Sequence, residues 1–352
     1  MNFSFSEDQL LFRDSVREFL SIEVTPELIR ELWKSESGRS QQLWQQFSEL
    51  GLTGMLVNEV FGGLSMNEED FILIAEECGR VALAEPLVEN SMVAVPLLQS
   101  CNNEAFNKKY LPGLVSGKIK LAVGHHINPL VSDAHIADLL LLQNNNEVHA
   151  VEKSQVQLLA QESVDPSRKL FKVKWSPSQK TCLASGAQGK QLWLQTLNRG
   201  ALAVATQHLG LAQQMVAMSV SYTSERKQFG KVVGSFQAVK HHMANVAVKY
   251  EFAKAVTYRA ANSVATQHPN ANVHVAHAKI AASEAALLAA KHGIQVHGAM
   301  GYTWEVNLQI WMKRAWALDN SWGSVGYHKK QVANFVLQDG NIEQRIGVGN
   351  TF

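Results

Sequence analysis

The C-terminal part of the chain, from about residue 190, consists largely of long alanine-rich segments whose apolar residues recur at helical spacing. Faces that are rich in alanine and poor in leucine allow helices to pack closely side by side, as in a four-helix bundle. The sequence therefore predicts a helical bundle over residues 191–352. Its expected helices are Ala201 to Ser221, Phe236 to Gln267, Val273 to His292, Leu308 to Leu318, and a final one near His328 to Leu337.

The first 116 residues are also predicted to be helical. Ser6, followed by two acidic residues, indicates a helix N-terminus. Glycines at 51 and at 62–63 mark turns between two further amphipathic segments, Leu43 to Leu50 and Glu68 to Val81. We expect an N-terminal helical domain over residues 1–116.

The pattern changes over residues 117–190, where short apolar runs alternate with polar breaks such as the three asparagines at 144–146. A spacing of about ten residues between such runs is typical of a compact antiparallel β-domain. Its polar loops are expected to face solvent. The runs are Leu121 to Val123, Leu139 to Leu142, Val148 to Val151, and Leu170 to Val173.

Composition narrows the possible functions. The formal net charge is +1, so no bulk electrostatic attraction favours nucleic acid or an anionic membrane. Cys78, Cys101 and Cys182 are far apart and show no C-x-x-C spacing, so the sequence indicates neither a disulfide framework nor a zinc site. This cysteine usage fits a reducing compartment.

The start of the chain lacks a basic segment followed by an apolar run, so we expect no signal peptide. Apolar stretches such as Ile136 to Leu142 are too short to span a bilayer. A cytoplasmic location without a membrane span is the resulting expectation.

Two segments of the C-terminal part carry residues suited to binding a nucleotide: residues 224–230, SERKQFG, and residues 295–303, QVHGAMGYT. Arg226 offers a planar fork of donors for a pyrophosphate, and Phe229 offers a face for a nucleotide or ribose. Gly298 allows backbone to approach a ligand, to which Gln295 can hydrogen-bond. Taken singly, each has a plainer interpretation: an arginine paired with a neighbouring glutamate, a core phenylalanine, and a helix C-cap glycine.

Together, in this order, the segments resemble the acyl-CoA dehydrogenase family. Residues 224–230, followed by FQAV at 236–239, resemble its "R-x-x-F-G... F-Q" segment, and residues 295–303 resemble its "Q-x-x-G-G-x-G-Y/F" segment, with Ala299 in place of the second glycine. Residues 51–55 with 61–64 resemble a family turn. The resemblance implies a mainly α fold with a small β-domain: an N-terminal helical domain, a middle β-barrel or sandwich, and a C-terminal four-helix bundle.

The same resemblance implies FAD as cofactor, an acyl-CoA substrate and an acceptor of the electron-transfer flavoprotein type. In the family the flavin sits between subunits, and the two C-terminal segments reach a flavin held mainly by a neighbour. Carried over, the residues expected to contact that flavin are Arg226, Gln228, Phe229, Gln295 and Gly298.

The chain departs from the family at the catalytic base, a glutamate in a "Y-E-G-T" segment that removes the α-proton of the thioester. Counted from Gly301, that position is Trp322, which cannot accept a proton. Other members carry the glutamate on an earlier helix, just before an arginine and a "G-x-A-A-Q-x-L-G" run. Here the run is Ala203 to Gly210, and the base position falls near Gly200.

A further departure concerns the family's "T-E-P-x-A-G-S-D" loop, which lines flavin and substrate. The corresponding stretch, Val123 to Leu130, reads VGHHINPL. His125 and His126 are candidate metal ligands or acid–base groups, although adjacent histidines in a loop are more often incidental, and no third ligand lies at a useful spacing.

These departures favour the hypothesis of a partner subunit without a base in a heteromeric α2β2 acyl-CoA dehydrogenase, of the kind acting on CoA-linked steroid side chains. A glutamate-bearing subunit would then be the partner, and the chain alone would be inactive. One alternative is a self-sufficient dehydrogenase with a displaced base, for which Glu305, Asp319 and His297 are candidates. Another is a scaffold paralogue that binds acyl-CoA or a partner without turnover.

Overall fold

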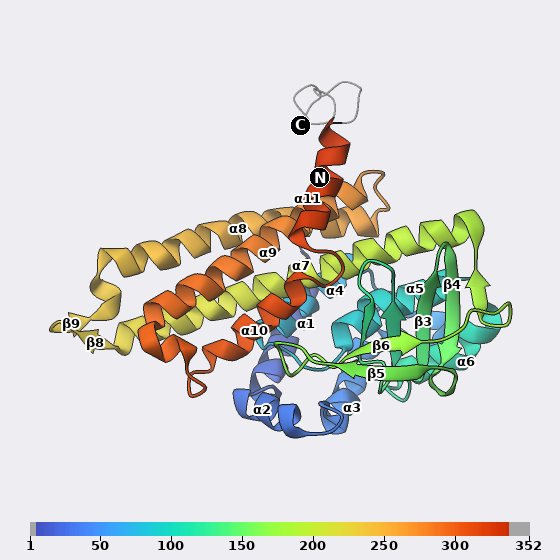
Figure 1. The fold of residues 1–352 in the computed structure, drawn as a ribbon, viewed down its shortest axis with the longest axis horizontal. Coiled ribbons are helices and arrows are strands. Elements are labelled where there is room, and N and C mark those ends of the chain that lie inside the picture. The colour runs from blue at the N-terminus through green and yellow to red at the C-terminus, as the bar shows by residue number, and fades with distance from the viewer. Residues whose placement is uncertain (1–4, 338–352) are drawn as a thin grey trace.

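The computed structural model describes residues 5–337 and shows helices at both ends of the chain around a β region (Figure 1). The predicted helix N-terminus at Ser6 is confirmed: its hydroxyl accepts from the backbone of Gln9, whose side chain caps Ser6 in return. The N-terminal α-helices are α1 (Glu7–Glu23), α2 (Pro26–Lys34), α3 (Gln41–Glu49), α4 (Glu68–Arg80), α5 (Val95–Ser100) and α6 (Glu104–Val115), and a π-helical segment, η3 (Glu89–Ala94), runs into α5.

The β region contains two small sheets and is not purely antiparallel. The first sheet has the order β1-β3-β4-β7 and the second the order β2-β6-β5. Their strands are β1 (Leu121–Gly124), β2 (Leu130–Ser132), β3 (Leu139–Asn144), β4 (Glu147–Glu152), β5 (Gln157–Gln161), β6 (Leu170–Lys174) and β7 (Cys182–Ala184). The antiparallel expectation is wrong for β1 and β3, which pair in parallel, because the chain crosses to the second sheet as β2 before it returns as β3.

The C-terminal helices form the long bundle that dominates Figure 1. They are α7 (Gly186–Glu225), α8 (Gln237–Ala265), α9 (Ala271–His297), α10 (Leu308–Asp319) and α11 (Val325–Leu337). Helix α7 begins well before the predicted start at Ala201, because tertiary contacts of buried Trp193 and Thr196 stabilise a stretch that glycines and polar residues make irregular in sequence. Residues 338–352 of the expected bundle lie outside the described residues, and the domain boundaries near 116 and 190 stay predictions.

Helices α4 and α7 cross with almost no space between their backbones. A Cβ atom added to Gly210 would lie 1.9 Å from the backbone oxygen of Glu76, and one added to Gly79 would lie 2.1 Å from that of Gln207. Each helix therefore uses a glycine to admit the backbone of the other. The same two helices are joined by an ion pair of 2.6 Å between Arg199 and Glu68. Arg199 is thus a partly buried residue within α7.

None of the helices described between residues 5 and 337 is both long and apolar enough to cross a membrane.

We predict that Gly210→Ala lowers the free energy of unfolding by about 1–3 kcal/mol, because the added methyl group must push α4 and α7 apart. Gly326→Ala in α11 is the matched control. A Cβ atom there meets nothing closer than 3.8 Å, so this change should be neutral or slightly stabilising. Urea midpoints of the two variants measure the difference, and equal midpoints would contradict the crossing.

Candidate functional site

The two positions predicted from the resemblance for the catalytic base, Gly200 and Trp322, lie in direct contact. Gly200 is in the middle of α7, and Trp322 lies in the loop between α10 and α11. A Cβ atom on Gly200 would lie 2.1 Å from the indole ring of Trp322, so only glycine admits this side chain. Trp322 is 5% exposed, and neither position offers a carboxylate.

Three cationic or imidazole side chains hold the loop that carries Trp322, and two of them, Lys279 and His328, are buried. Arg168, on the β region, donates to the hydroxyl of Ser321 at 2.8 Å. Lys279 of α9 donates to the backbone oxygen of Asp319 at 2.8 Å, and the ring of His328 donates to the backbone oxygen of Trp322 at 3.0 Å. Burial lowers the pKa of Lys279 to about 8 and that of His328 to about 4, so His328 is neutral at pH 7.

His125 lies against the indole ring of Trp322. Its ring stacks on that of Trp322, with centroids 4.1 Å apart and planes inclined by 15°. Burial, followed by the proximity of His126, lowers the pKa of His125 to about 3, so the ring is neutral, and its Nδ1 has no hydrogen-bond partner. His126 is exposed and contacts Gln143. Of these two histidines, only His125 contacts Trp322, and its ring packs against the indole.

Little room remains around the indole. Trp322 lines one cavity of about 60 Å³, between α7, η3 and the β region, and a second of about 50 Å³ beside α11. Pockets that hold organic ligands usually measure about 300–1,000 Å³. Neither of these two cavities is large enough for an acyl chain.

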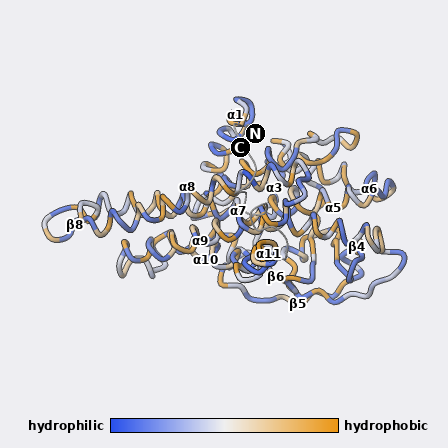
Figure 2. Tube along the Cα trace, turned by 90° about the horizontal axis from the view of Figure 1, so that it is seen from above, coloured by the Kyte–Doolittle hydropathy of each residue, from blue (hydrophilic) through white to orange (hydrophobic). Residues whose placement is uncertain are grey.

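The residues predicted to contact a neighbour's flavin gather at the far end of the bundle. Arg226 ends α7, and Gln228 and Phe229 follow in a hairpin of β8 (Lys227–Gln228) and β9 (Lys231–Val232). Phe229 has φ +55° and Gly230 has φ +78°, the geometry of a two-residue type I′ turn, which leaves Phe229 90% exposed at the tip. This hairpin projects beyond the body of the molecule and is mostly hydrophilic (Figure 2).

The second predicted segment reaches the same end of the bundle. Gln295 is exposed in the last turn of α9, and Gly298 follows at φ +61° with nothing within 4 Å of an added Cβ atom. The ends of α7 and α9 touch through Tyr222 and His297, whose rings stack at 4.3 Å. The structure thus brings the two segments together, away from Trp322.

Two family models match the chain: acyl-CoA dehydrogenase, N-terminal domain, over residues 6–118, and acyl-CoA dehydrogenase, C-terminal domain, over residues 187–337. Acyl-CoA dehydrogenase IpdE2 of Mycolicibacterium smegmatis is 30% identical over 313 residues, covering 88% of this chain and 93% of the relative. The chain belongs to the acyl-CoA dehydrogenase family. Residues 119–186, which hold the β region, lie between the two matched ranges.

Other similar proteins agree with this assignment. Acyl-CoA dehydrogenase IpdE2 of Mycobacterium tuberculosis is 27% identical over 316 residues, covering 88% of this chain and 91% of the relative. The structure of the ChsE4-ChsE5 complex from Mycobacterium tuberculosis matches with a TM-score of 0.87 at 20% identity, covering 97% of this chain and 100% of that one. The Tcur3481-Tcur3483 steroid ACAD G363A variant matches with a TM-score of 0.84 at 19% identity, covering 93% and 97%. These structures confirm the acyl-CoA dehydrogenase fold class.

The three residues considered as displaced bases lie outside the two cavities described beside Trp322. Glu305 is exposed before α10, His297 stacks on Tyr222, and Asp319 lies beside Lys279.

Sequence reasoning missed Glu89, a carboxylate at the start of η3 that lines the same cavity as Trp322. Burial raises its pKa to about 7, although the nearby Arg168 works in the opposite direction. Arg168, Lys279 and His328 were missed as well. A single cation or histidine forms no sequence motif. Arg168 donates to a residue 153 positions away, and Lys279 and His328 donate to backbone oxygens, which any residue type provides.

We predict that Gly200→Ala lowers the free energy of unfolding by about 1–3 kcal/mol, because its methyl group meets the indole of Trp322. In a Trp322→Ala background the same change should cost little, since the ring is gone. The double-mutant cycle, measured by urea unfolding, should give a coupling of about 0.5–3 kcal/mol. Strict additivity would show that the two side chains do not compete for this space.

Proposed function

We propose that this chain is the subunit of a heteromeric acyl-CoA dehydrogenase that lacks the catalytic base and completes the flavin site of a glutamate-bearing partner. The contact between Gly200 and Trp322 carries the proposal, since both base positions lack a carboxylate and the indole fills the space between them. A chain so arranged contributes to α,β-dehydrogenation of an acyl-CoA only through a neighbour's site.

The chemistry explains why the partner is needed. Removal of the α-proton requires a carboxylate within hydrogen-bond reach of that proton. FAD, when bound, accepts the hydride from the β-carbon. Trp322 offers no proton acceptor at this place, because indole only donates, and His125 is a weak base because burial lowers its pKa to about 3. In the proposed complex the partner supplies the base.

The exposed end of the bundle fits the distal part of a dinucleotide. Among the described residues, the guanidinium of Arg226 has no ion-pair or hydrogen-bond partner. The plainer interpretation of this arginine, a pairing with a neighbouring glutamate, is therefore not observed. Its five donors suit a pyrophosphate. Phe229 offers an exposed ring, Gly298 leaves backbone uncovered, and Gln295 is free to donate or accept. These residues and Gln228 would hold a partner's FAD.

Relatives extend the proposal to substrate and partners. Two similar structures are named as pairs of chains, and one of them is named a steroid ACAD, which supports a heteromer acting on a steroid-type acyl-CoA. A relative from Acetobacterium woodii is named as a subunit of a caffeyl-CoA reductase-Etf complex, which supports an acceptor of the electron-transfer flavoprotein type. A cytoplasmic location belongs to the same proposal.

The decisive experiment is co-expression with a glutamate-bearing paralogue. We expect the chain alone to bind FAD weakly and to show no dehydrogenase activity with an artificial acceptor. The pair should form a heterotetramer with one FAD per heterodimer, because each interface combines one complete and one complementary half-site. A homotetramer with one tightly bound FAD per chain would overturn the proposal.

The cavity shared by Glu89 and Trp322 supports a second candidate function, a self-sufficient dehydrogenase with Glu89 as base, since a pKa near 7 suits proton transfer. Its small volume speaks against this reading. In the same assay, turnover by the chain alone that is lost in Glu89→Gln would establish the second candidate in place of the first.

We predict that Arg226→Ala weakens FAD binding by the co-expressed complex by about 1.5–3 kcal/mol, the range for hydrogen bonds to charged groups. Arg226→Lys should restore little, because lysine lacks the planar fork. Lys227→Ala, which removes an adjacent exposed charge, is the matched control and should change affinity less. Flavin fluorescence titrations measure all three, and unchanged affinity in both Arg226 variants would refute the assignment.

A further inference from the structure

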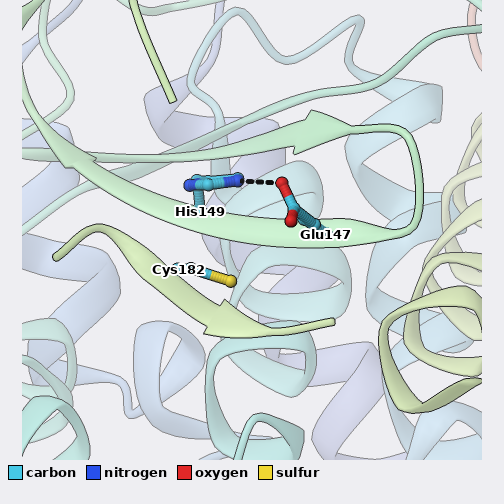
Figure 3. Close-up of side chains that lie close together, drawn as sticks. All are labelled: Glu147, His149 and Cys182. Atoms are coloured by element: carbon cyan, nitrogen blue, oxygen red, sulfur yellow. Dashed lines mark hydrogen bonds and ion pairs between the residues drawn. The ribbon is translucent and has the colours of Figure 1, made fainter. Parts of the chain in front are cut away.

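Three potential metal ligands meet at the edge of the first β-sheet, far from the motifs of the family. Glu147 and His149 are two residues apart on β4, so their side chains share one face of the strand. Cys182 of β7 is the cross-strand partner of His149 in the register. One ligand atom from each of the three lies within 4.8 Å of the other two. Figure 3 shows the sulfur of Cys182 beside the contact between the other two side chains.

The hydrogen bonds of His149 prepare one ring nitrogen for a cation. Nδ1 of His149 lies 2.9 Å from the hydroxyl of Thr181, which also lies 3.0 Å from the backbone oxygen of Ser178, and in the tautomer with its proton on Nδ1 the ring donates to this hydroxyl. In that tautomer Nε2 directs a lone pair toward a carboxylate oxygen of Glu147, 3.0 Å away, and a cation between the two atoms would take the place of the proton that joins them in the other tautomer. A histidine that donates through one nitrogen and ligates through the other is the usual arrangement in metal sites.

We propose that Glu147, His149 and Cys182 bind a divalent cation of the zinc type, with water in the fourth position. One nitrogen, one sulfur and one oxygen donor form a set that zinc accepts in tetrahedral geometry, and calcium and magnesium do not favour sulfur. Tetrahedral bonds of about 2.0–2.1 Å to nitrogen and oxygen place those two atoms roughly 3.3 Å apart, so the contact between His149 and Glu147 needs to open only slightly.

The surroundings allow the site to form. Burial, followed by the negative charge of Glu147, raises the pKa of the Cys182 thiol, and a bound cation reverses this influence by favouring the thiolate. The ring of Trp175 covers His149 at 5.0 Å, whereas Glu147 and Cys182 remain partly exposed and leave an entry path. The indole of Trp193 donates to the backbone oxygen of Glu147 at 2.9 Å, so the cation would tie two strands to the first turns of α7.

Cobalt(II) titration of the full-length, metal-free chain under a phosphine reductant tests this site independently of the proposed function. We expect one equivalent of cobalt to produce a thiolate-to-metal charge-transfer band and the visible bands of tetrahedral cobalt, both removed by zinc. Zinc should also raise the Tm of the metal-free chain. Absence of these bands at stoichiometric cobalt, together with a Tm that zinc leaves unchanged, would overturn the proposal.

Variants assign the ligands. Cys182→Ser should abolish the charge-transfer band and the zinc-induced rise in Tm, whereas Cys78→Ala, in the buried N-terminal core, should retain both. Thr181→Val should weaken cobalt binding by about 10–100-fold, the usual effect of removing the partner of a ligating histidine. Because Thr181→Val leaves all three ligands in place, it tests whether the orientation of the His149 ring matters for cobalt binding, apart from any loss of a ligand. A band that persists in Cys182→Ser, or an unchanged affinity in Thr181→Val, would refute the assignment.

Discussion

Two glycines of α7, Gly200 and Gly210, let other parts of the chain come into contact with the backbone of this helix. The arrangement of the rest of the molecule depends on these two contacts. At Gly210 the backbone of α4 comes within contact of α7, and this crossing joins the N-terminal helices to the bundle. At Gly200, about ten residues earlier on the same helix, the missing side chain is replaced by the indole of Trp322. Protein interiors are closely packed, so the register of α7 determines both its contact with α4 at Gly210 and its contact with Trp322 at Gly200.

The helices were the most predictable part of the fold. Periodic apolar residues and caps are local signals, and Ser6 with Gln9 shows how completely a few adjacent residues specify a helix start. The four predicted strands coincide with β1, β3, β4 and β6, whereas β2, β5 and β7 were not predicted. The parallel pairing of β1 with β3 was also missed, since it depends on where the intervening chain goes. The early start of α7 escaped prediction for a similar reason, because burial of Trp193 outweighs the local helix propensity.

For the candidate site, too, local sequence patterns predicted some features and long-range contacts escaped prediction. Motif spacing sufficed to single out Trp322 and Gly200, yet their mutual contact is a long-range property that no local pattern contains. The flavin-facing residues followed from two contiguous segments, and they remain a prediction. Glu147, His149 and Cys182 lay beyond reach of sequence reasoning, because only the sheet register brings a cysteine opposite a histidine 33 positions earlier along the chain.

Two bulky residues of the chain, Trp322 and Phe229, have backbone conformations that are rare for their residue types. Trp322 and Phe229 both have positive φ, at +57° and +55°, and each is followed by a glycine with positive φ. Bulky residues rarely adopt this conformation, which costs about 1–3 kcal/mol and persists only where surrounding contacts require it. Trp322 has such contacts in His125, Arg168 acting through Ser321, and His328. Phe229 is exposed, and its positive φ belongs to the two-residue turn of the β8–β9 hairpin. The strain at Trp322 is thus balanced by packing within the chain, whereas Phe229 remains exposed at the tip of its hairpin.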